Sequence, residues 1–116
     1  MNEQQRLTGI ELAAIGQTIH KQIGMWPLAE VGARNFVYGY FTLQGEKQLP
    51  GFRFTAKPTT RLVDVYIMLE PSDTYRVIVR KRNVSTPVSL LDLEGVYADQ
   101  LAGIIRELPK TLQKGA

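Results

Sequence analysis

The first regular pattern in the chain places apolar residues three and four positions apart, as on one face of a helix. These residues are Leu12, Ile15, Ile19 and Ile23. Thr8 followed three residues later by Glu11 fits a capping box, which marks the start of a helix. Gly24 is suited to a helix end, and Pro27 follows it closely. The spacing therefore predicts a helix over residues 8–23.

Between residues 35 and 82 the apolar spacing changes to two, and aromatic and β-branched residues cluster between turn residues. This alternation is typical of strands. The turn residues divide the region into four strands, at about residues 35–43, 51–57, 61–70 and 74–82. Connections this short force neighbouring strands to run antiparallel, so we expect a four-stranded meander.

A second helical stripe follows near the C-terminal end. Its apolar members are Val96, Tyr97, Leu101, Ile104, Ile105 and Leu108. Asp92 is a candidate N-cap, with Ser89 as the alternative, and Pro109 is a candidate terminator. The pattern therefore predicts a helix over residues 92–108 and a frayed end beyond it. The element order is then α-β-β-β-β-α. We expect an α+β fold in which both helices pack on one face of an antiparallel sheet.

The length of 116 residues and the 44% hydrophobic content fit one domain over residues 1–116. No stretch approaches the roughly 18 apolar residues that cross a bilayer. The polar start of the chain also lacks the apolar region of a secretory signal. We therefore expect a cytoplasmic protein without membrane attachment.

The inventory of reactive side chains is small. Without cysteine, thiol chemistry, disulfides and Cys-containing metal sites are excluded. His20 is the only histidine, which leaves little material for a histidine metal cluster or a Ser-His pair. We expect no enzyme activity, no cofactor and no metal. An enzyme would instead need a concave pocket with converging ionisable groups.

The formal net charge is +3, and its placement along the chain is uneven. Residues 1–50 hold four basic and four acidic residues. Residues 51–83 hold seven basic and three acidic residues, and residues 84–116 hold three basic and four acidic ones. The whole positive surplus therefore lies in the predicted sheet.

Side chains alternate across a strand, so we assign the more aliphatic set of each strand to the face that the helices cover. That set is Val37, Gly39, Phe41 and Leu43, then Phe52, Phe54 and Ala56, then Val63, Val65, Ile67 and Leu69, and finally Tyr75, Val77 and Val79. The opposite side, here named the open face, would carry Tyr38, Tyr40 and Tyr66 interleaved with Arg53, Lys57, Arg76, Arg80 and Arg82.

Tyrosine rings can stack on unpaired bases while basic side chains hold phosphates. The leading hypothesis is a non-enzymatic accessory module that binds single-stranded nucleic acid, DNA or RNA, through these eight residues. Two alternatives stay open. Tyr and Arg are good strand formers, and Arg stems can cover rings on a simply solvated face. The same residue types are also enriched at protein interfaces, which would fit a homodimer or a host protein partner.

A further pattern is carried by short segments between residues 18 and 108. They are Thr18-Ile19, Gln22-Ile23-Gly24, Gly32-Ala33-Arg34-Asn35-Phe36, Gly51-Phe52-Arg53-Phe54, Asp73-Thr74-Tyr75, Gly95-Val96-Tyr97, Leu101 and Ile104. In these segments the sequence resembles a family of small phage and mobile-element proteins of uncharacterised function. The resemblance implies an accessory role inside a host cell. It also implies that an inhibitor of a host defence protein, of the anti-CRISPR kind, is an alternative.

Overall fold

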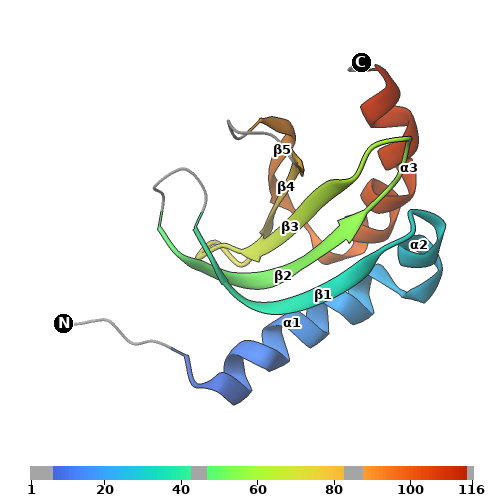
Figure 1. The fold of residues 1–116 in the computed structure, drawn as a ribbon. Coiled ribbons are helices and arrows are strands. Elements are labelled where there is room, and N and C mark those ends of the chain that lie inside the picture. The colour runs from blue at the N-terminus through green and yellow to red at the C-terminus, as the bar shows by residue number, and fades with distance from the viewer. Residues whose placement is uncertain (1–6, 43–46, 83–87, 115–116) are drawn as a thin grey trace.

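The computed structural model describes residues 7–42, 47–82 and 88–114. They form an α+β fold with an antiparallel sheet in the order β1-β2-β3-β4-β5 and helices at both ends of the chain (Figure 1). The elements are α1 (Gly9–Ile23), α2 (Met25–Glu30), β1 (Arg34–Phe41), β2 (Leu49–Ala56), β3 (Val63–Leu69), β4 (Tyr75–Lys81), β5 (Ser89–Val96), the 3-10 turn η1 (Ala98–Gln100) and α3 (Leu101–Lys114).

The predicted first helix is confirmed, together with its cap. The backbone N–H of Glu11 donates to the Thr8 hydroxyl at 3.1 Å, and the backbone N–H of Thr8 donates to the Glu11 carboxylate at 2.9 Å. Gly24 ends the helix at φ 91°, a conformation that favours glycine. The short helix α2, which the pattern did not predict, starts directly after it. Pro27 is tolerated there because the first N–H groups of a helix have no partner within the helix.

The four predicted strands are confirmed, but a fifth was missed, and the helix predicted over residues 92–108 is confirmed only from Leu101 onward. Residues 89–96 form a fifth strand, and Asp92 lies in its middle as the cross-strand partner of Ile78. Leu91 and Leu93 are two positions apart and pair with Val79 and Val77 of β4. A short apolar run of this kind fits a helix and a strand equally well, and here pairing with β4 decides for the strand.

The predicted end at Pro109 was also wrong, since α3 continues to Lys114 with this proline inside it. A proline within a helix removes one hydrogen bond and usually ends or kinks the helix. Here the turns on both sides of it are held by packing, because Leu108 is fully buried and Leu112 packs against the core. Tertiary contacts therefore keep residues 109–114 helical, although this end of the chain was expected to fray.

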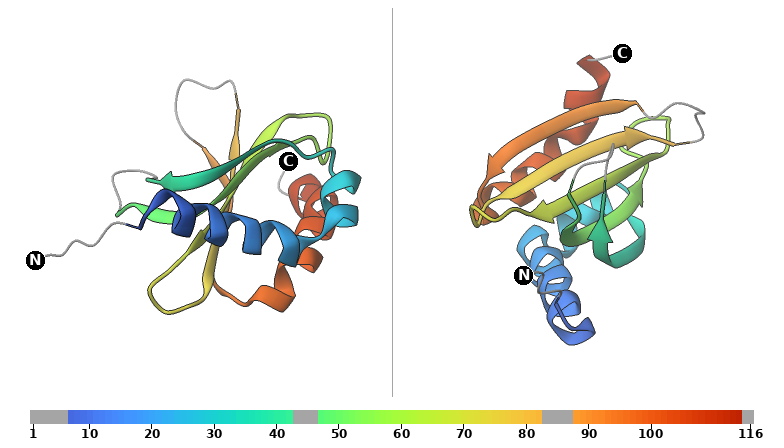
Figure 2. Two further views of the ribbon diagram at one scale, coloured as in Figure 1. Left: turned by 90° about the horizontal axis from the view of Figure 1, so that it is seen from below. Right: turned by 90° about the vertical axis from the view of Figure 1, so that its left-hand side faces the viewer.

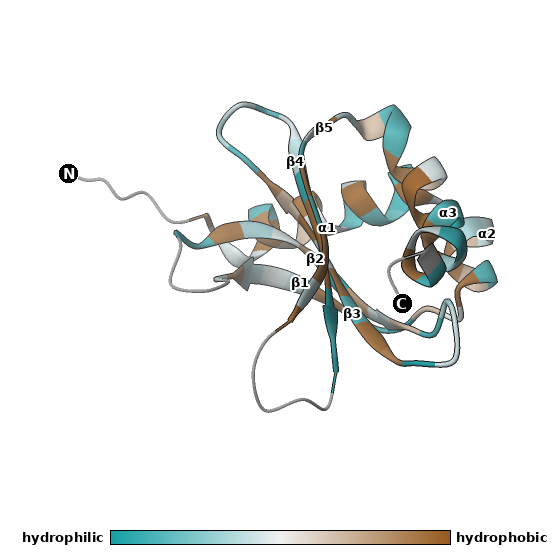
Figure 3. Ribbon diagram, turned by 90° about the horizontal axis from the view of Figure 1, so that it is seen from above, coloured by the Kyte–Doolittle hydropathy of each residue, from teal (hydrophilic) through white to brown (hydrophobic). Residues whose placement is uncertain are grey.

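The helices pack on one face of the sheet and close a single main core (Figure 2). α1 packs on β1 and β2, and α3 packs against α2 and β5. Bands of hydrophobic and hydrophilic residues alternate along the helices, as expected for amphipathic elements (Figure 3). The face assignment of the second to fourth strands is confirmed. Their buried members are Phe52, Phe54, Ala56, Val63, Val65, Ile67, Tyr75, Val77 and Val79.

Candidate binding surface

The faces of β1 are the reverse of the prediction. Tyr38 is the cross-strand partner of the core residue Phe52, so both side chains lie on the helix-covered face. The Tyr38 ring lies against Gly16 of α1, where an added Cβ would be 2.5 Å from ring atoms. The Tyr40 hydroxyl accepts a hydrogen bond from the backbone N–H of Leu7 at 2.9 Å. Placing Tyr38 and Tyr40 on the open face was therefore wrong.

A cluster of aromatic rings explains this reversal. His20 of α1 lies with its ring centroid 4.8 Å from those of Phe36 and Phe52, and its Nδ1 is 3.0 Å from the Tyr38 hydroxyl. Burial in this cluster lowers the pKa of His20. β1 approaches α1 closely at Tyr38, where a Cβ added at Gly16 would be 2.6 Å from the Tyr38 Cβ. The aromatic set thus faces the helix, and the smaller Val37 and Gly39 face the other way.

The register across the sheet fixes which residues share the open face. One row across the strands holds Val37, Arg53, Tyr66, Ile78 and Asp92, and the next row holds Arg34, Thr55, Asp64, Arg80 and Ser89. Arg53, Tyr66, Arg76 and Arg80 therefore lie on the face where they were predicted. Lys57 is exposed just beyond β2. The predicted inward position Leu43 lies outside the described residues.

The aromatic part of the open face is a small packed cluster. Met68 and Ile78 are buried beneath partly buried Phe41, Leu49 and Tyr66. The Tyr66 ring meets the Phe41 ring edge to face, with centroids 5.6 Å apart. Phe41 was predicted on the covered face. Its position on the open face is a second consequence of the reversal of β1. Tyr66 is thus the one predicted tyrosine that remains available to a ligand on this side.

Two of the predicted arginines are held by acidic neighbours. Arg76 donates two hydrogen bonds to Asp92, at 3.0 and 2.9 Å, in a fork geometry. The Arg82 guanidinium is 3.4 Å from the Asp64 carboxylate, which also accepts a hydrogen bond from the Thr55 hydroxyl at 3.1 Å. These pairs neutralise Asp64 on the central strand β3 and Asp92 on the edge strand β5.

Arg53 and Arg80 are different. Within the part of the chain that the structure describes, neither forms an ion pair, and the buried Nε of Arg53 has no hydrogen-bond partner. Arg53 is the direct cross-strand partner of Tyr66, and Arg80 is that of Asp64. The two arginines therefore lie on neighbouring rows of the open face, beside Tyr66, the one predicted tyrosine that remains there.

The antiparallel order brings further cations to the same end of the sheet. β1 begins there with Arg34, and β2 ends there next to Lys57. We name the basic patch as Arg34, Arg53, Lys57, Arg80 and Arg82. The sequence interpretation missed Arg34, although its position at the start of a strand could have identified it once the strand register was known.

Comparisons with known proteins add no relative, since no family model, curated protein or solved structure matches the chain. The resemblance to phage and mobile-element proteins therefore stays a prediction. None of the described helices is long and apolar enough to cross a membrane. In residues 7–42, 47–82 and 88–114, no three His, Asp or Glu side chains gather as metal ligands would.

Proposed function

We propose that this protein is a non-enzymatic accessory module that binds single-stranded nucleic acid at the basic patch. The observation that carries the proposal is the pair Arg53 and Arg80. Both lie on an open sheet face beside Tyr66, and neither forms an ion pair among the described residues. Planar guanidinium groups bind phosphate oxygens in a two-pronged geometry, so this pair suits a phosphate backbone.

The mode of binding differs from the one that the alternation of residues predicted. With Tyr38 and Tyr40 on the covered face, stacking is limited to Tyr66 and its neighbour Phe41, and most of the binding energy comes from phosphate contacts. Such contacts release counterions and depend little on base sequence. We expect weak sequence preference and a strong dependence on salt. In the mobile-element setting that the resemblance implies, such a module would act on host or element strands.

A protein partner on the same face is the second candidate function. It is favoured by the apolar cluster of Phe41, Leu49 and Tyr66 next to Val37, which is 36% exposed. Aromatic residues beside arginines are frequent at the centres of protein interfaces. This candidate predicts a homodimer or a complex with a host protein that buries Arg53. Light scattering of the pure protein tests the homodimer.

The test is a titration of fluorescently labelled 12-nucleotide thymidine and uridine strands, followed by anisotropy at 50 and 200 mM salt. The variant combines Arg53→Gln with Arg80→Gln, which keeps part of each stem. Single strands contribute a slope of about 0.7 in log Kd against log salt for each phosphate neutralised. Loss of two contacts should therefore lower that slope by about 1.4 and weaken binding at 50 mM salt by tenfold or more.

The control is Arg106→Gln, because Arg106 lies on α3 with its guanidinium 3.5 Å from Glu30, away from the open face. It lowers the net charge by one unit without touching the basic patch, so it is matched to each single variant, Arg53→Gln and Arg80→Gln. Binding that is independent of salt, or that Arg106→Gln reduces as much as the double variant does, would contradict the proposal. A stable dimer with Arg53 buried would favour the protein partner instead.

A further inference from the structure

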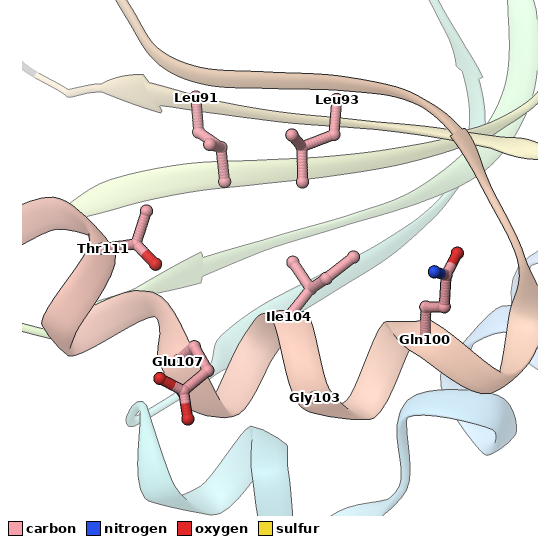
Figure 4. Close-up of a pocket in the computed structure, with 7 residues that line it drawn as sticks. All are labelled: Leu91, Leu93, Gln100, Gly103, Ile104, Glu107 and Thr111. Atoms are coloured by element: carbon pink, nitrogen blue, oxygen red, sulfur yellow. The ribbon is translucent and has the colours of Figure 1, made fainter.

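A second surface lies on the opposite edge of the fold, between β5 and α3. A groove of about 490 Å³ opens there, lined by Leu91, Leu93, Gln100, Gly103, Ile104, Glu107 and Thr111. Leu91 and Leu93 point from the strand toward Ile104 on the helix (Figure 4). These three side chains are only partly buried, although they border the main core. The fold therefore leaves apolar surface uncovered at this position.

The strand that forms one wall of the groove is also an edge of the sheet. β5 is the last strand in the order, so among the described residues no strand pairs with its outer side. An edge strand of eight residues offers backbone N–H and C=O groups to an added strand. A partner segment that pairs with β5 would send alternate side chains into the groove, which is the arrangement of β-strand addition.

The side chains of β5 that do not face the groove are partly acidic. Asp92 is the cross-strand partner of Ile78, so it points to the open face, away from the groove. Glu94, two residues further on, is exposed. The charged residues on β5 and in the lining of the groove are Asp92, Glu94 and Glu107. On the neighbouring strand β4, Arg76 binds Asp92, and Arg80 is the cross-strand partner of Ser89. The carboxylates that this edge offers to a partner are therefore Glu94 and Glu107, and both are exposed.

These carboxylates speak against a second copy of this chain as the occupant. Two β5 strands paired edge to edge and antiparallel would bring Asp92 and Glu94 close to their own copies. Like charges opposite one another in a sheet are destabilising. Register irregularities at both ends of the β4–β5 pair also limit a long, flat pairing. A segment of another protein that carries basic residues would be attracted by these carboxylates, and its pairing with β5 does not require two-fold symmetry.

We propose that the β5–α3 groove binds an extended segment of a partner protein in which apolar and basic residues alternate. The segment pairs with β5 through its backbone. Its apolar side chains enter the groove over Leu91, Leu93 and Ile104, and its basic side chains lie beside Glu94. This site shares no residue with the basic patch and does not depend on the nucleic-acid proposal.

The probe is a capped octapeptide in which lysine alternates with leucine, and binding is followed by calorimetry and by amide hydrogen exchange of the full chain. We expect binding that slows exchange in residues 89–96. Glu94→Lys should weaken it about tenfold, since one attraction becomes a repulsion. Glu30→Lys is the matched control, because it makes the same charge change on α2 outside the groove. It should leave the affinity unchanged.

Two further arms separate strand pairing from charge attraction. A peptide N-methylated at the residues that would bond to β5 cannot donate these hydrogen bonds and should not bind. Gly103→Leu should also block binding. Gly103 is exposed and an added Cβ there meets nothing within 4 Å, so the larger side chain starts in open space. The folding of this variant is checked by circular dichroism.

The proposal is overturned if the lysine peptide does not bind at 1 mM, or if an octapeptide with glutamate in place of lysine binds equally well. It is also overturned if Glu94→Lys or N-methylation has no effect, or if residues 89–96 are protected by dimerisation in the free protein. The Arg53 and Arg80 double variant should bind the peptide normally, so failure here and failure of the nucleic-acid proposal are distinguishable.

Discussion

The two faces of the sheet use the same kinds of residue in opposite ways, as Tyr38 and Tyr66 demonstrate. Tyr38 is on the edge strand β1, yet it is packed between Gly16 and Phe52, and its hydroxyl lies within hydrogen-bonding distance of His20. Tyr66 is on the central strand β3, yet it stays half-buried on the open face. Whether a tyrosine is covered therefore depends on whether α1 packs against its face of the sheet, and not on how central its strand is.

Charge separates the faces just as clearly. Within the described residues, Thr55 is the one buried polar residue, and it belongs to the open face, where it contacts Asp64 and Arg82. The covered face holds apolar and aromatic groups that stabilise the fold, and the open face holds the cations available to a ligand. Substitutions on the two faces should consequently affect different measurements.

The largest difference is expected between Tyr38→Ala and Tyr66→Ala. Removing a packed aromatic side chain costs about 3–5 kcal/mol of unfolding free energy when it is fully buried. Both tyrosines are partly buried, so we expect less than this. The cost should be about 2–3 kcal/mol for Tyr38, which loses its packing against α1 and its contact with His20, and about 1 kcal/mol for Tyr66. Urea unfolding measures both. An equal or larger cost at Tyr66 would reverse the roles assigned to the two faces.

A smaller effect is expected when the close contact between α1 and Tyr38 is disturbed. Gly16→Ala places a Cβ against the Tyr38 ring, and overpacking of this kind costs about 1–3 kcal/mol. The helix propensity of alanine returns up to about 1 kcal/mol, so we expect a net loss of about 1–2 kcal/mol. Gly103→Ala is the matched control on α3. There the open space lets propensity act alone, and stability should rise slightly. A gain at both glycines would mean that Tyr38 can move aside at little cost.

The smallest effect is a dependence of stability on pH through His20. Burial lowers the pKa of His20 below its ordinary 6.5, so the unfolded chain binds this proton more readily than the folded protein does. The stabilising contribution is complete above pH 6.5. It decreases as the pH falls below 6.5 and levels off below the lowered folded pKa. Urea unfolding between pH 8 and pH 5 measures this loss, which His20→Gln should remove. An unchanged pH profile in that variant would exclude His20 as its source.

The sequence predicted some elements well because their signals are local. The capping box of Thr8 and Glu11 and the glycine at position 24 lie within the helix that they delimit, and its bounds were confirmed. β2, β3 and β4 have one aliphatic face each, so the alternation itself identified the buried side chains. For the candidate site, this placed Arg53, Tyr66, Arg76 and Arg80 correctly.

The errors occurred where the deciding partner is distant in the chain. β1 carries bulky residues on both faces, so its alternation gives no preference until α1 is in place. Leu91 and Leu93 fit a helix or a strand, and the free edge of β4 selected the strand. Arg76 and Arg82 looked available until the register placed Asp92 and Asp64 beside them.

The amino-acid sequence by itself determined where the chain turns, which segments are amphipathic, and that the positive charge lies in the sheet, because these depend on neighbours a few residues apart. Only the tertiary structure decided which side of β1 is covered, which arginines keep a free guanidinium group, and that an apolar groove remains beside β5. These depend on contacts between segments far apart in the chain, where a side chain's environment is set by whatever packs against it.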